Sequence, residues 1–238
     1  MKKNLKTILA LTLAVVFIIP FALVLSACGA TTQVVSTYGE LVSALSGTSN
    51  VVKLDADIDV EDMLLVKREM TLDLNGHKLY NTKDIWFDKE EPHKWSIIEV
   101  GKDGVLTITG NGKIDAKEND CYAIDVADGG KLTIEDGEFI GNISAVYVYE
   151  GSAEIKGGKF SIKQLNDNKV ESEYGQTVNI YNKNAENKTA TVSITGGLFK
   201  NFDPAGKIDN PHDELVAKGY KAVETKIDGE KYYEIVKE

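Results

Sequence analysis

Short segments in which apolar and polar residues alternate recur along most of the chain. An apolar-polar-apolar triplet is typical of a strand with one buried side and one solvent-facing side. Each strand of a first set is followed by a turn that contains glycine, and then by a strand of a second set. The first set is Leu72-Asp73-Leu74, Leu106-Thr107-Ile108, Leu132-Thr133-Ile134, Ala153-Glu154-Ile155 and Val192-Ser193-Ile194, and the second is Lys78-Leu79, Gly112-Lys113-Ile114, Gly137-Glu138-Phe139, Gly158-Lys159-Phe160 and Gly197-Leu198-Phe199.

A third alternating strand is expected before each of these pairs. Three short strands with glycine at the corners describe one coil of a solenoid, and stacked coils bury an apolar row that a single coil cannot bury. We therefore predict an all-β fold, a single-stranded right-handed parallel β-helix of about five coils, with its longest loops at 80–95, 163–176 and 182–190. The third strands are Val52-Lys53-Leu54, Ile98-Glu99-Val100, Ile124-Asp125-Val126, Val146-Tyr147-Val148 and Val178-Asn179-Ile180.

Both ends of such a fold need caps, because open strand edges invite association. Thr37-Tyr38-Gly39-Glu40 has the spacing of a capping box and predicts an N-terminal helix cap that ends near Gly47. Asp228-Gly229 lies between two strand-like segments, 220–223 and 232–236, and predicts a C-terminal β-hairpin cap.

These segments resemble pectate-lyase-like parallel β-helix proteins of bacteria. The segment from about 36 to 80, with Leu72 to Leu79 (LDLNGHKL), is similar to their entry coils. Residues 194–199 (ITGGLF), followed by 202–204 (FDP) and 215–220 (LVAKGY), are similar to the closing segment of surface and phage-like members. The resemblance covers nearly the whole chain after residue 35. It implies the architecture and leaves the function open, because this fold hosts lyases, hydrolases, adhesins and structural proteins.

The first residues have the pattern of a secretory leader. Lys2, Lys3 and Lys6 precede an apolar run that ends in Leu25-Ser26-Ala27-Cys28. This ending resembles the lipobox of bacterial lipoproteins, which implies cleavage before Cys28 and attachment of lipid to it. An uncleaved membrane helix and an ordinary secretion signal remain alternatives. We expect a signal peptide at 1–27, a lipidated tether at 28–35 and a β-helix domain at 36–238.

The charge of the chain restricts its partners and its chemistry. Its formal net charge is −10 at pH 7, so nucleic acid is excluded as a partner. Uronate lyases of the resembled superfamily commonly use an arginine or lysine base beside a calcium site, whereas the only arginine here, Arg68, precedes the first clear coil. Without Cys28 the chain has only Cys121, which we interpret as a buried apolar residue.

The sharpest catalytic candidates are Glu99 and Asp125, at the same place in neighbouring coils. Stacked strands lie roughly 4.8 Å apart, so the two carboxyls are expected to be close enough to serve a polysaccharide hydrolase. A solvated acidic face is the competing interpretation. The same row continues with Tyr147 and Asn179, which we expect to contact a ligand. A second row, Lys113, Glu138 and Lys159, alternates in charge and is interpreted as a structural ladder.

Further candidates are aromatic or acidic. Tyr149, Trp86 and Trp95 are expected either to stack on a ligand or to fold over the coils. Asp55, Asp57 and Asp59 offer oxygen ligands for Ca²⁺, but the same alternation describes a strand with one wet side. No cofactor is otherwise expected, and no histidine has a partner at metal-ligand spacing.

The sequence thus predicts a lipoprotein on the extracytoplasmic face of a bacterial membrane, held by lipid on Cys28. Its β-helix is expected to bind a cell-surface polysaccharide or a protein without catalysis. Two alternatives stay open, a hydrolase that uses Glu99 and Asp125, and a purely structural or assembly role.

Overall fold

The computed structural model describes residues 31–85, 95–117, 121–165, 176–206 and 215–238. Nearly all of the regular structure consists of three sheets, which we call A, B and C. Sheet A holds β1 (Thr32–Val35), β2 (Val51–Leu54), β5 (Glu69–Asp73), β8 (Val105–Thr109), β11 (Gly130–Ile134), β14 (Gly151–Ile155) and β17 (Ala190–Ile194). Sheet B holds β3 (Ile58–Asp59), β6 (Lys78–Tyr80), β9 (Lys113–Asp115), β12 (Glu138–Gly141), β15 (Lys159–Ile162), β18 (Leu198–Lys200), β20 (Glu230–Lys237) and β19 (Tyr220–Ile227). Sheet C holds β4 (Leu64–Val66), β7 (Ser96–Val100), β10 (Tyr122–Val126), β13 (Ser144–Val148) and β16 (Val178–Ile180).

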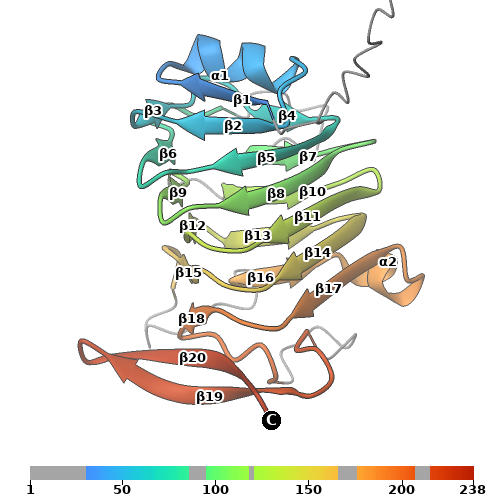
Figure 1. The fold of residues 1–238 in the computed structure, drawn as a ribbon. Coiled ribbons are helices and arrows are strands. Elements are labelled where there is room, and N and C mark those ends of the chain that lie inside the picture. Colours follow the sequence, from blue (N-terminus) through green and yellow to red (C-terminus); the bar gives the residue numbers. More distant parts are fainter. Residues whose placement is uncertain (1–30, 86–94, 118–120, 166–175, 207–214) are drawn as a thin grey trace, which may run out of the picture.

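The chain visits the three sheets in a fixed order. From β2 to β16 it passes through sheets A, B and C five times, and each strand lies beside the equivalent strand of the next passage (Figure 1). The neighbours are parallel throughout this region; for example, Leu106, Leu132 and Ala153 occupy one register position. The repeat expected from the alternating pattern is therefore present in the fold, which is all-β with long parallel sheets.

One strand belongs to a different sheet from the one expected. Val52-Lys53-Leu54 lies in sheet A, where Val52 is in register with Leu72, and β4 is the strand of sheet C that precedes β7. An apolar-polar-apolar triplet fits any of the three sheets equally well. Sheet membership is set by the corners between strands, and those of the first passage lack the glycines that mark later ones.

The apolar sides of the three sheets pack into one core. Its largest fully buried side chains include Phe139, Phe160 and Phe199, at equivalent places in successive strands of sheet B. Their rings stack, with centroids 5.1 Å apart in the first pair and 4.9 Å in the second. Each passage thus places a ring on the ring before it, which favours the observed register over a slipped one.

Glycines at the corner between sheets C and A allow close approach of neighbouring passages. A Cβ at Gly130 would lie 2.1 Å from the carbonyl oxygen of Val100, and a Cβ at Gly151 would lie 2.2 Å from that of Gly130. Gly151 also has a φ of 133°, which side chains disfavour. No other residue fits at these two places without backbone movement.

The N-terminal end is capped by α1 (Tyr38–Leu45), which begins with the expected capping box between Thr37 and Glu40. Arg68 satisfies the other end of this helix, because its guanidinium donates to the carbonyl oxygens of Leu45 and Ala44 at 2.9 and 2.8 Å. The single arginine of the chain is thus a helix-capping residue.

The expected tether at 28–35 overlaps strand β1. Thr32–Val35 pairs in parallel with β2, and Val35 is buried, because the exposed edge of β2 provides a template for one more strand. The folded region therefore starts before the boundary predicted at residue 36.

The C-terminal cap is the expected β-hairpin. β19 and β20 pair in antiparallel fashion around Asp228 and Gly229, whose φ values of 53° and 83° fit a tight hairpin turn. β20 also pairs with β18 and so covers the last parallel strand of sheet B. A short helix, α2 (Asn182–Glu186), lies within the loop expected at 182–190.

Candidate functional site

The side of sheet C that faces away from the core carries the predicted site row. Leu65, Glu99, Asp125, Tyr147 and Asn179 occupy one register position on β4, β7, β10, β13 and β16. The residues on either side of this position in each strand point into the core, where Ile98, Ile124 and Val146 are buried. The fold thus brings together the four site residues that the sequence aligned.

Burial on this face differs from the expectation of a solvated acidic row. Asp125 is 0% exposed and Glu99 is 9% exposed. Other residues of these strands are buried as well, among them Ile97, Ala123 and Ala145, which belong to the apolar core cluster. Alternation shows which side of a strand a residue occupies, but it does not show whether that side is covered.

The Asp125 carboxyl is buried with little compensation. Among the described residues no side chain donates a hydrogen bond to either of its oxygens, the backbone of Val126 favours its charged form only weakly, and Glu99 lies in register with it on the next strand. Burial, with a smaller contribution from the charge of Glu99, raises the pKa of Asp125 well above its usual value. A buried carboxyl of this kind keeps its proton where exposed carboxyls have lost theirs.

Glu99 lies against the backbone of its own strand end. A Cβ on Gly101 would be 3.3 Å from Oε1 of Glu99 and 3.1 Å from Cδ1 of Leu65. A side chain at position 101 would therefore press on both of its neighbours. The glycine leaves room for the glutamate on the outer side of β7.

Tyrosines form the accessible part of the face. Tyr122 lies against Tyr147, with ring centroids 4.7 Å apart, and Tyr149 stacks on Tyr181 at 4.9 Å with an interplanar angle of 24°. Tyr181 is 37% exposed, whereas Tyr147 is half-buried and desolvation raises the pKa of its hydroxyl. The exposed ring surface therefore lies beside the buried acids.

The Tyr149–Tyr181 pair is held by backbone contacts. The amide of Tyr181 donates to the carbonyl oxygen of Val148 at 2.9 Å, and the side chain of Asn184 donates to that of Tyr149 at 2.7 Å. Tyr181 was not among the predicted site residues. Alignment of Val148 with Ile180 in the repeat puts residue 149 opposite residue 181, so the signal was present in the sequence.

The other predicted aromatic residues are more scattered. Trp95 is 37% exposed and directly precedes β7, where its carbonyl oxygen accepts a hydrogen bond from the amide of Tyr122 at 2.6 Å. Trp86 and the lipidation candidate Cys28 lie outside the described residues. Trp95 therefore stays a candidate contact residue at the start of sheet C.

The acidic run near the N-terminal end contacts the next passage of the chain. Asp57 accepts a hydrogen bond from the amide of Lys78 at 2.8 Å, and Asp59 accepts from the amide and the hydroxyl of Thr82 at 2.9 and 2.6 Å. Asp55 is exposed. Among the described residues, no group of three or more His, Cys, Asp or Glu side chains is placed to hold a metal ion. Two of the three Ca²⁺ candidates thus hold backbone in place.

Charged residues on sheet B pair with one another. Asp115 lies 2.9 Å from Nζ of Lys78 and 2.8 Å from Nζ of Lys163. Lys113 lies 2.7 Å from Glu138 in the predicted ladder, and Nζ of the next member, Lys159, lies over the ring of Tyr232. These contacts fit the structural interpretation of the ladder.

Cys121 is 0% exposed, and burial raises the pKa of its thiol. It is thus a packed apolar residue rather than a nucleophile. In the described part of the chain, no helix is both long enough and apolar enough to cross a bilayer.

Comparison with known proteins finds no match for this chain among models of protein families, among curated proteins or among solved structures. The functional argument therefore rests on the site itself.

Proposed function

We propose that the protein is an extracytoplasmic lipoprotein, anchored through Cys28, that binds glycans on the outer side of sheet C without cleaving them. In this proposal the three sheets are the sides of one right-handed parallel β-helix of the pectate-lyase-like kind. The cyclic order of the sheets and the parallel register support that architecture. The leader and its Leu25-Ser26-Ala27-Cys28 ending support the anchor.

The stacked pair Tyr149–Tyr181 is the observation that carries the proposal. Hydrogen bonds fix the backbone of both residues, the two rings stack on each other, and Tyr181 is exposed, so the pair is partly preorganised for binding. Flat, partly exposed aromatic rings beside hydrogen-bonding groups suit ligands with one apolar face and one polar edge, as sugar rings have. Asn179, half-buried two residues before the exposed ring of Tyr181, supplies an amide for such an edge.

A hydrolase that uses Glu99 and Asp125 is the second candidate. Its support is the register of the two carboxyls and the raised pKa of Asp125, which is what a general acid needs. Access counts against it, because a general acid has to reach the glycosidic oxygen and Asp125 is 0% exposed. The binding role needs no such access, so we favour it.

The test is retention and turnover on a panel of neutral and acidic polysaccharides. Protein that starts at residue 29 is incubated with each polymer, and bound protein, new reducing ends and unsaturated products are measured. The proposal expects retention by at least one polymer without products. Turnover that is lost in Glu99→Gln or Asp125→Asn would establish the hydrolase instead. Absence of both retention and turnover would exclude glycans and favour a protein partner or a structural role.

A further inference from the structure

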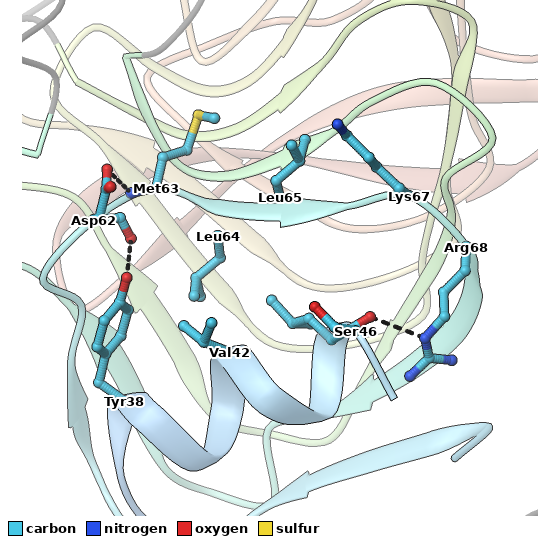
Figure 2. A pocket seen from close by; sticks show the side chains of 10 residues that line it. Tyr38, Val42, Ser46, Asp62, Met63, Leu64, Leu65, Lys67 and Arg68 are labelled. Atoms are coloured by element: carbon cyan, nitrogen blue, oxygen red, sulfur yellow. Dashed lines mark hydrogen bonds between the residues drawn. The ribbon is translucent and has the colours of Figure 1, made fainter. Parts of the chain in front are cut away.

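The N-terminal end of the domain carries an apolar groove. The groove lies between α1 and β4, the edge strand of sheet C, and has a volume of about 490 Å³. Figure 2 shows Val42 of the helix facing Leu64 of the strand, whereas Met63 and Leu65, which also line the groove, point to the other side of the strand. Tyr38 closes one end, where its hydroxyl donates to the carbonyl oxygen of Asp62, and Arg68 closes the other.

The groove opens to an exposed apolar surface. Val42 is 41% exposed, and Val34, on the neighbouring strand β1, is 56% exposed. Met63 and Leu65 are half-buried. Among the described residues, exposed large apolar side chains elsewhere on the molecule are Trp95, Tyr181 and Val223. Two of the five therefore belong to this one end.

The path of the chain limits how far this end lies from the proposed lipid. Strand β1 begins at Thr32, four residues after Cys28. Four extended residues span at most roughly 14 Å. The hairpin β19–β20 lies at the opposite end of the stack of strands (Figure 1). A lipid on Cys28 thus brings the α1 end to the bilayer and leaves the hairpin pointing away.

The charged residues near the groove indicate which kind of bilayer it contacts. The Arg68 guanidinium is occupied by carbonyl oxygens at the end of α1, so Lys67 is the exposed basic side chain of the lining. Glu61 and Asp62 are exposed beside it. This surface has no excess of positive charge that would attract anionic lipids, so its contact is apolar, with Tyr38 and Lys67 suited to the interface.

We infer that the groove between α1 and β4, with Val42 at its rim, rests on the interface of a zwitterionic phospholipid bilayer. The inference rests on the proposed lipid anchor and adds which face of the domain meets the membrane. It orients the stack of strands along the bilayer normal, so that successive strands of sheet C lie at increasing height above the membrane.

Nitroxide labels test this orientation. Val42→Cys and Val223→Cys replace two valines of similar exposure, 41% and 40%, at opposite ends of the molecule. Cys121 stays unlabelled because it is buried. The full chain is expressed with its leader, purified and placed in phosphatidylcholine vesicles, and each label is probed with oxygen and with an aqueous nickel complex.

The inference predicts that the label at position 42 loses nickel accessibility and gains oxygen accessibility on vesicles, while the label at position 223 stays aqueous. Equal nickel accessibility at both positions would overturn it, and so would spin–spin broadening at position 42, which marks a second copy.

Flotation with the vesicles separates the proposed lipid anchor from the inferred orientation. Chain that fails to float overturns the anchor and the inference together, whereas chain that floats with an aqueous label at 42 overturns the inference alone. The chain that starts at residue 29, which has neither the leader nor the lipid, is the control that should not float.

Discussion

Sheets B and C belong to the same passages of the chain, yet an aspartate on the outer side of sheet B is in ion pairs, whereas one on the outer side of sheet C is buried. On sheet B, Asp115 lies between two lysine ammonium groups at 2.9 and 2.8 Å. On sheet C, Asp125 is fully buried, and no side chain among the described residues donates a hydrogen bond to its carboxyl oxygens. Paired charge of the first kind stabilises the fold, whereas an unpaired buried carboxyl destabilises it. The outer side of sheet C therefore carries a buried carboxyl at a cost to stability, beside Tyr122 and Tyr147.

The two aspartates also differ in the direction of their pKa. Burial raises the pKa of Asp115, but hydrogen bonds from Lys163 and Lys78 outweigh it and hold the pKa below its usual value. The stability that Asp115 contributes is therefore present above the unfolded pKa and lost as the pH falls through the folded one. The pKa of Asp125 is raised in the folded state. The stability of the fold is therefore highest, as far as Asp125 is concerned, below the pKa of the unfolded chain, and it falls as the pH rises towards the folded-state pKa.

Removal of the paired aspartate is expected to have the largest effect. Asp115→Ala leaves Lys78 and Lys163 facing each other without their acceptor, and hydrogen bonds to charged groups each contribute about 1.5–3 kcal/mol. We expect the free energy of unfolding at pH 7 to fall by about 2 kcal/mol, measured by urea denaturation. The exposed Asp55→Ala is the matched control and should change stability by less than about 0.5 kcal/mol. A loss of the same size in both variants would show that the pairing on sheet B is not stabilising.

Neutralising the unpaired aspartate should act in the opposite direction. Asp125→Asn removes the ionisation that the unfolded chain gains as the pH rises above about 3.9. We expect the variant to be more stable than wild type at pH 7, with the gain shrinking as the pH falls and vanishing near pH 4. Urea denaturation across pH 4–8 measures the difference, and the exposed Asp55→Asn is the control for the change in net charge. A pH-independent effect of Asp125→Asn would contradict the buried-carboxyl interpretation.

The ladder on sheet B should show a small pairwise coupling. Lys113 and Glu138 are 2.7 Å apart but 37% and 31% exposed, and exposed ion pairs contribute about 0.2–1 kcal/mol. A double-mutant cycle with alanine at both positions should give a coupling of about 0.5 kcal/mol that shrinks in 1 M salt. The cycle of Lys113 with the distant Glu69 should give none. Equal coupling in both cycles would mean that Lys113 and Glu138 affect stability through the net charge of the chain and not through their contact.

The sequence predicted the strands and their register well, because an alternating triplet that recurs with glycine corners leaves few ways to stack. Alignment of Glu99, Asp125, Tyr147 and Asn179 on one row came from that repeat alone. The capping box and the Asp228-Gly229 hairpin were also predicted, because local hydrogen bonds and turn geometry determine both.

What failed depends on contacts that a repeat does not encode. The strand at Val52 was assigned to the wrong sheet, because its triplet is compatible with all three. Burial of Glu99 and Asp125 depends on what covers the outer side of sheet C, and a two-residue period says nothing about that. Arg68 was interpreted only as remote from the site, and its contact with the end of α1 required the path of the chain.

The central claim is that sheet C is the binding side of the molecule and sheet B its structural side. The most direct test is the dissociation constant of a retained glycan for Tyr181→Ala and for the control Tyr80→Ala, which removes a tyrosine from sheet B at Lys78. Truncation of a contact aromatic typically costs more than about 1 kcal/mol of binding free energy. We predict that Tyr181→Ala weakens binding about tenfold or more, as that energy implies, and that Tyr80→Ala leaves it unchanged. Equal weakening by both variants, or by neither, would contradict the assignment of binding to sheet C.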